Sequence, residues 1–181
     1  MGQRKWKEAL NTIDDWEKGL ENQTDSAASD LDQSPKATKR HHKMLAWAET
    51  SRAVCLLELE KLKDAETSAN KALENQGITD SNRHRANSVI AVCLAHQKDF
   101  DAAEEKAVEA YESLNEKITD APSNMLWYVP RAAERVIKVY ELAEKPGESK
   151  KWQAKLTEVE QDLTENASED SEQESPSLRI E

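Results

Sequence analysis

Residues 62–73 read LKDAETSANKAL, and residues 100–111 read FDAAEEKAVEAY. Each stretch begins with a large apolar residue and places Ala three, seven and ten positions later. The segments before them align at the same offset of 38 residues, so that Cys55 matches Cys93. Spacings of three and four put side chains on one face of a helix. The repeat therefore predicts stacked helical units that bury their apolar faces against one another.

The composition of the chain also favours an all-α fold. Of its 181 residues, 37% are hydrophobic and 34% are charged, and only four Gly and five Pro are available for turns. These are too few for a barrel, a sandwich or a wound sheet. The mean hydropathy is −0.88, and neither an export signal nor an apolar run of membrane-spanning length is apparent. We therefore expect a cytoplasmic protein that does not insert into a membrane.

Apolar residues recur at helical spacing along most of the chain and predict about seven helices. The polar segment 22–37 is expected to be a flexible linker, and the acidic segment 164–181 a disordered tail. Short connections elsewhere predict antiparallel neighbours. The expected helices cover residues 3–21, 38–61, 62–76, 80–97, 99–117, 123–144 and 148–163.

Residues with special backbone preferences mark several of the expected helix ends. Gly77 suits the left-handed position that ends a helix. One of Thr79, Asp80 and Ser81 is expected to cap the helix that follows.

Two further signals concern the expected helix 123–144. Ser123 can cap it, and Pro130 falls inside it, which predicts either a kink or a short separate turn. Beside this proline stand Trp127 and Tyr128, whose side chains we expect in the core rather than on a binding surface.

The 38-residue repeat resembles the tetratricopeptide repeat, a helix–turn–helix unit of 34 residues. That family alternates small residues, which let two helices approach closely, with large ones that fill the gaps. Its positions are filled in one copy by Ala53, Leu56, Leu62, Ala65, Ala69 and Ala72, and in the next by Ala91, Leu94, Phe100, Ala103, Ala107 and Ala110. The resemblance implies an α-solenoid of antiparallel helix pairs.

The resemblance divides one domain, residues 1–163, into repeat copies. Complete copies lie near 45–78, 83–118 and 130–163, and a half copy occupies 3–21. The last copy departs from the pattern, with Ile137 for a small residue, Ser149 for Ala and Gln153 for a bulky apolar residue. The half copy is either an edge cap or the stump of a longer array.

In this family the first helix of each pair lines a concave groove, and the resemblance carries those positions onto this chain. The candidate peptide-binding residues are Trp47, Ser51, Val54, Arg85, Val89, Val92, Arg131, Arg135 and Lys138. The same positions also include Thr50, Leu57, Glu58, Ser88, Ala95, His96, Glu134, Glu141 and Leu142. Four of the candidates are cations in a chain of net charge −11, which favours a partner with carboxylates and apolar anchors. Alternatively, these cations pair with acids on neighbouring helices.

The chain offers no recognisable catalytic or metal-binding motif. It lacks a Gly-rich phosphate loop, a serine elbow and a Cys-x-x-Cys pair. His41 and His42 point about 100° apart on a helix and are expected to be solvated rather than to share an ion. Cys55 and Cys93 are expected to be buried packing residues. We therefore expect no enzyme, cofactor or metal, and the negative charge argues against nucleic acid as a partner.

These observations predict a non-catalytic protein–protein interaction scaffold that binds a peptide or partner segment in a concave groove, and the candidate cations favour an acidic one. Val54 and Val89 stand where the family's chaperone-binding carboxylate clamp has Asn, which disfavours that partner. The acidic residues 165–174 either solubilise the chain or occupy the groove themselves. A further alternative is a structural segment of a larger protein or assembly, such as the arrays attached to bacterial Ser/Thr kinases.

Overall fold

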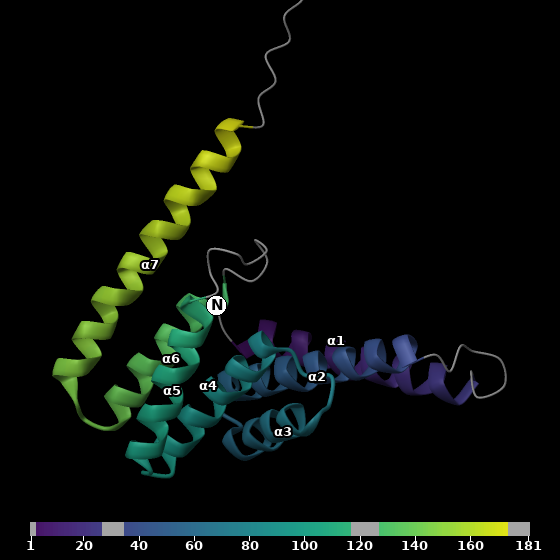
Figure 1. Cartoon of the computed structure of the whole chain (residues 1–181). Helices are drawn as coiled ribbons and strands as arrows, with labels where there is room; N and C mark the ends of the chain where they lie inside the picture. The colour runs from purple at the N-terminus through teal and green to yellow at the C-terminus, as the bar shows by residue number, and fades with distance from the viewer. Residues whose placement is uncertain (1–2, 27–34, 117–126, 174–181) are drawn as a thin grey trace, which may run out of the picture.

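The computed structural model describes residues 3–26, 35–116 and 127–173, in which seven α-helices and no strand are found (Figure 1). This confirms the all-α prediction for the described part of the chain. None of these helices carries a stretch long and apolar enough to cross a bilayer. The helices are α1 Gln3–Ser26, α2 Pro35–Glu58, α3 Leu62–Glu74, α4 Asp80–His96, α5 Phe100–Asn115, α6 Tyr128–Leu142 and α7 Pro146–Gln173.

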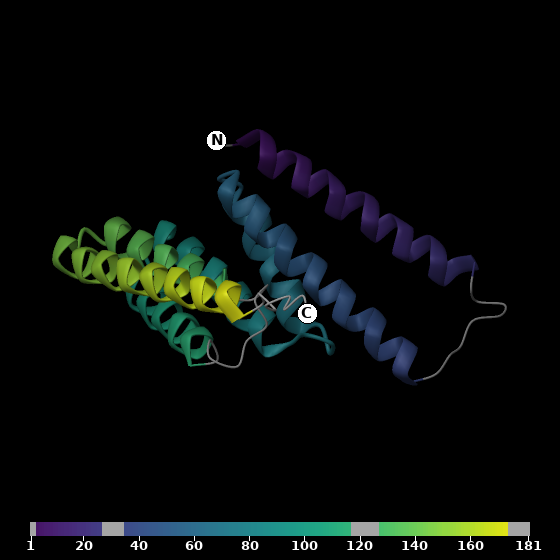
Figure 2. The same cartoon turned by 90° about the horizontal axis from the view of Figure 1, so that it is seen from above.

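Each helix packs against the next one in chain order, and α4 also contacts both α2 and α6. Two views show α1 and α2 at one end of the molecule and α7 at the other (Figures 1 and 2). Because four helices surround α4, most of its second half is buried, including Val89, Ile90 and Cys93. The main apolar cluster runs from α4 through α5 and α6 to α7, where Tyr111 and Trp152 meet edge to face at 4.8 Å.

The same backbone turn occurs three times. Glu60, Lys98 and Glu144 are the described non-glycine residues with positive φ, at 59°, 69° and 55°. In each turn the following residue donates its N–H to the carbonyl five positions back, as in a Schellman helix end. These bonds are Lys61 to Leu56 (2.9 Å), Asp99 to Leu94 (3.1 Å) and Lys145 to Tyr140 (2.9 Å). The turns therefore recur after 38 and then after 46 residues, and the first of these intervals equals the offset of the sequence repeat.

Small residues fill the contacts between helices, as the repeat pattern predicts. Eight alanines of the two middle copies are at most 1% exposed. Cβ-sized side chains let neighbouring backbones approach closely enough for the large residues around them to interlock. These alanines are Ala53, Ala65, Ala69, Ala72, Ala91, Ala103, Ala107 and Ala110.

Gly77 serves close packing and not the left-handed conformation that we predicted for it. No described glycine has positive φ. A Cβ on Gly77 would lie 2.3 Å from the carbonyl carbon of His42 and 2.4 Å from the nitrogen of Lys43, so this connection runs against the backbone of α2. Thr79 then caps α4, its side chain accepting the N–H of Asn82 at 3.4 Å.

Three helices extend further than the sequence predicted. Helix α1 continues to Ser26 and α2 begins at Pro35, so the expected linker 22–37 is helical at both ends, while 27–34 lie outside the described residues. A proline is well tolerated in the first helical turn, where its missing N–H has no partner to lose. Helix α7 runs to Gln173 through ten residues of the expected disordered tail. That segment is polar but contains no Gly or Pro, and polarity alone does not stop a helix.

The start of α6 also differs from the prediction. Pro130 lies in its first turn, because the helix begins at Tyr128, so neither a mid-helix kink nor a separate turn is needed. The expected cap Ser123 lies outside the described residues. Trp127 is 74% exposed, which contradicts its expected place in the core, whereas Tyr128 is half-buried.

Helix α1 is held on α2 by an apolar cluster and by Arg52. Ile13 and Trp16 of α1 pack with Ala48 and Cys55 of α2. Beside them, Arg52 donates to the carboxylates of Asp14 (2.6 Å) and Glu17. Burial alone would lower the pKa of Arg52, yet these hydrogen bonds raise it above its ordinary value.

Candidate functional site

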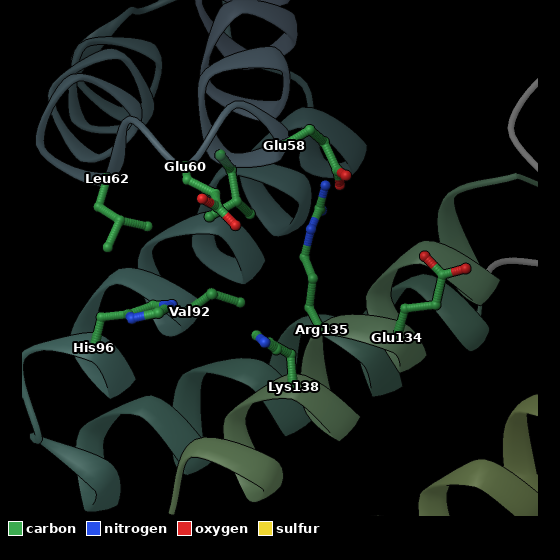
Figure 3. A pocket seen from close by; sticks show the side chains of 9 residues that line it. Glu58, Glu60, Leu62, Val92, His96, Glu134, Arg135 and Lys138 are labelled. Carbon is green, nitrogen blue, oxygen red and sulfur yellow. The ribbon is translucent and has the colours of Figure 1, made fainter. Parts of the chain in front are cut away.

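A groove of about 590 Å³ opens where α2, α4 and α6 meet (Figure 3). Val92 and Leu57 form an apolar part of its wall. The groove is lined by Leu57, Glu58, Glu60, Leu62, Val92, His96, Glu134, Arg135 and Lys138. It therefore joins side chains of α2, α4 and α6, with Glu60 from the turn after α2 and Leu62 from the start of α3.

The lining mixes charges of both signs. Three carboxylates, those of Glu58, Glu60 and Glu134, accompany the cations Arg135 and Lys138. Figure 3 shows the guanidinium of Arg135 pointing toward the carboxylate of Glu58, and the ammonium of Lys138 extending into the hollow. A surface of this kind suits a polypeptide that brings both a carboxylate and a cationic or polar group.

Arg135 is a buried cation at the floor of this groove. It is only 7% exposed, and its guanidinium donates to the hydroxyl of Ser88 at 2.7 Å. Burial lowers the pKa of Arg135 to about 10, and the nearby charge of Arg85 acts in the same direction. None of the ion pairs within the described ranges includes Arg135. The bond to Ser88 uses one of the five N–H donors of the guanidinium, and the charge of Glu58 raises the pKa of Arg135 against the effect of burial, so a carboxylate that enters the groove would share this cation with Glu58.

Arg85 of α4 lies next to the groove but is not one of the residues that line it. Its guanidinium lies 4.2 Å from the ring centroid of Tyr128 and donates to the side-chain oxygen of Asn82 at 3.0 Å. Burial lowers the pKa of Arg85 as well. Ser88 joins the two arginines, because its hydroxyl donates to the carbonyl of Arg85 at 2.7 Å while it accepts from Arg135.

Only three of the nine candidate binding residues, Val92, Arg135 and Lys138, line the groove. Val89 is fully buried and offers no surface to a ligand, because α4 is covered by its neighbours. Arg131 is exposed and pairs with Glu134 at 2.7 Å.

The remaining candidates, Trp47, Ser51 and Val54, lie on α2. Trp47 is 44% exposed and meets Trp16 edge to face at 5.7 Å. Ser51 and Val54 are half-buried on the same helix. The four expected cations differ in burial: Arg131 and Lys138 are exposed, Arg85 is half-buried and Arg135 is buried, although the charges of Arg85 and Arg131 both reach Arg135 and lower its pKa.

Sequence reasoning missed two groove residues, Glu60 and Leu62. Glu60 belongs to the turn after α2 and Leu62 is the first residue of α3, whereas the groove positions that we carried over lie on the first helix of each pair only. The repeated turn was the available signal, since the groove begins where its first copy meets α4 and α6. Four other lining residues, Leu57, Glu58, His96 and Glu134, do stand at family groove positions.

Other chemistry receives little support in the described ranges. No cluster there combines three or more His, Cys, Asp or Glu side chains that a metal ion would need. Cys55 and Cys93 are free and buried, and burial raises the pKa of the Cys93 thiol to about 11, so it is a poor nucleophile.

Comparison with known proteins adds no relative: no protein family, no curated protein and no solved structure matches this chain. Its own groove and turns therefore carry the functional argument.

Proposed function

We propose that this protein is a non-catalytic, tetratricopeptide-like scaffold that binds a polypeptide segment in the groove between α2, α4 and α6. The observation that carries the proposal is the groove itself, whose floor holds a buried arginine without an ion-pair partner in the described ranges. An extended segment with one carboxylate would meet Arg135, and an apolar side chain beside it would meet Val92 and Leu57.

Two features support a solenoid of antiparallel helix pairs. The first is the turn that recurs at Glu60, Lys98 and Glu144, after α2, α4 and α6. The second is the contact of α4 with both α2 and α6, which brings the first helix of each repeat beside the next one. If each helix pair is rotated in the same direction relative to the pair before it, the pairs form a curved stack with α2, α4 and α6 on its concave side.

The groove chemistry modifies the expected partner. Because Glu58, Glu60 and Glu134 line it together with Arg135 and Lys138, a purely acidic segment would meet repulsion as well as attraction. We therefore propose a mixed-charge segment with one carboxylate for Arg135 in place of a uniformly acidic one. A cytoplasmic location is part of the same proposal.

Selection from a phage-displayed library of random peptides tests this function. Peptides selected on the wild type should bind Lys138→Glu at least tenfold more weakly, because the substitution places a fourth carboxylate in the hollow. Their affinity for Lys150→Glu should equal their affinity for the wild type, since Lys150 is an exposed cation of α7 outside the groove. Equal loss in both variants, or in neither, would count against the groove.

A second candidate function, a structural segment of a larger protein, is favoured by Trp47. This side chain is 44% exposed next to Trp16, at the end of the molecule formed by α1 and α2. Such a pair suits an additional helix or domain packed there. Reading the frame upstream discriminates the two candidates: a kinase domain or further repeats would favour the structural segment.

A further inference from the structure

The first two turns of α2 carry an unusual stripe of positive charge. Lys36, Lys39, Arg40 and Lys43 are all exposed, and their spacing of three or four residues puts them on one face of the helix. No ion pair within the described ranges involves any of the four. We call these four residues the basic stripe.

The basic stripe destabilises its own helix. Like charges three and four residues apart repel one another. The amino end of a helix is also the positive end of its dipole, where acidic residues are favoured, yet the first turn of α2 contains none. In a chain of net charge −11, four unpaired cations at this end are better explained by an anionic surface that covers them.

The same protein carries a surface of matching spacing and opposite charge. Exposed carboxylates of Glu105, Glu109, Glu112 and Glu116 follow one face of α5 and line a hollow of about 500 Å³ with Val108 and Tyr140. No ion pair in the described part of the chain involves these four glutamates. We call them the acidic stripe.

The two stripes agree in register. Lys36, Arg40 and Lys43 lie at positions i, i+4 and i+7, and so do Glu105, Glu109 and Glu112. Two helices that cross at a small angle therefore bring several opposite charges together at once, and the hollow beside α5 gives long side chains room.

Within one molecule the stripes cannot meet. Helix α2 begins at the end of the molecule opposite α5, α6 and α7 in both views (Figures 1 and 2). We infer that the basic stripe of one copy docks on the acidic stripe of a second copy. Because the contact joins two different surfaces, it leaves a free stripe at each end and propagates as a chain of copies.

Charge reversal with rescue tests this contact. One variant carries Lys36→Glu, Arg40→Glu and Lys43→Glu, and the other carries Glu105→Lys, Glu109→Lys and Glu112→Lys. Analytical ultracentrifugation from about 10 μM to about 1 mM covers the range in which a few exposed ion pairs act. The mass of the wild type should rise above 20.5 kDa with concentration. Each variant alone should stay monomeric, and an equimolar mixture of the two should associate again.

Matched controls distinguish the effect of the basic stripe on assembly from the effects of net charge and of the groove. Lys61→Glu, Lys63→Glu and Lys150→Glu together change the charge equally on other exposed positions, and this variant should assemble like the wild type. The groove variant Lys138→Glu should also assemble, so failure of the groove proposal leaves this one standing. Circular dichroism verifies that the variants are folded, and where one is not, a variant with Gln at the same three positions replaces it in the test for loss of association.

Three results would overturn the inference. The first is a wild type that remains monomeric throughout the concentration range. The second is a mixture of the two reversed variants that fails to associate although both are folded. The third is a monomeric wild type that binds a labelled single-stranded RNA through Lys36, Arg40 and Lys43, which would assign the basic stripe to nucleic acid.

Discussion

Arg135 of α6 and Ser88 of α4 are joined by a hydrogen bond of 2.7 Å that spans 47 residues of sequence. Ser88 is fully buried and Arg135 is nearly so. This bond therefore fixes the position of the guanidinium at the groove. It also ties α6 to α4, where the same Ser88 hydroxyl donates to the carbonyl of Arg85.

Ser88→Ala should lower the free energy of unfolding by about 1–3 kcal/mol, because it leaves buried donors of Arg135 without their acceptor. Arg135→Met should change stability little or raise it, since it removes a charge whose pKa burial has lowered to about 10. Urea denaturation of both variants measures the difference. A larger loss in Arg135→Met than in Ser88→Ala would show that the guanidinium is a net stabiliser.

Gly77→Ala should destabilise the fold by about 1–3 kcal/mol or more, because its Cβ would overlap the backbone of α2 at His42 and Lys43. The control is Gly147→Ala in α7, where a Cβ meets nothing within 4 Å and a better helix former replaces glycine. Thermal denaturation should separate the two variants in opposite directions. Similar melting temperatures would mean that the 75–79 connection is free to shift.

Lys98→Gly should raise the free energy of unfolding by about 0.5–1 kcal/mol. At a φ of 69° a lysine is strained and glycine is not, and this gain exceeds the entropy that glycine adds to the unfolded chain. Asp99→Gly, one residue later at a φ of −86°, has no strain to relieve and should be destabilising. If both substitutions have the same sign in chemical denaturation, the turn is not a source of strain.

Arg52→Met should loosen α1 selectively. Without its guanidinium, the carboxylates of Asp14, Glu17 and Glu49 lose a counter-charge at the α1–α2 contact. Amide hydrogen exchange of α1 should become about tenfold faster or more, with α4 to α7 unchanged. Arg4→Ala, which breaks only an exposed pair with Glu8, is the control and should leave exchange as it was.

The sequence predicts the seven helices, the repeat offset and the buried alanines, because each depends on spacing within a single helix or its copy. It does not predict how many sides of a helix are covered. Val89 stands at a groove position, yet α4 is enclosed by four helices and has no free face there. Trp127 is large and apolar, yet it precedes α6 and is left outside.

The groove itself was half predictable. Arg135, Lys138 and Val92 were found because helix positions carry over between repeats. Glu60 was not, because it lies in a turn without periodicity, and Leu62 was not, because it begins α3, the second helix of its pair, from which we carried over no groove position. The hydrogen bond between Arg135 and Ser88 could not be predicted either, because a contact between residues 47 positions apart produces no local sequence pattern.

Tyr140→Phe should remove an acid-sensitive part of the stability. Hydrogen bonds from Lys145 and from the hydroxyl of Tyr140 lower the pKa of Glu104, while burial, followed by this bond, raises the pKa of Tyr140 to about 12. A depressed carboxyl pKa stabilises the fold above the unfolded pKa, and this gain disappears as pH falls through the folded value. The variant should lose about 1 kcal/mol at pH 7 and nothing near pH 2. Urea titrations at both pH values decide it: an equal loss at each would assign the effect to packing.

Residues 164–173, the last ten of α7, contain no apolar residue larger than alanine. A sequence of this kind forms helix by intrinsic preference, which fades gradually with heating, whereas packed helices melt together. A temperature scan of ellipticity at 222 nm should consequently show a sloping decline before the main transition. Ending the chain after Thr164 should flatten that slope and leave the midpoint where it was.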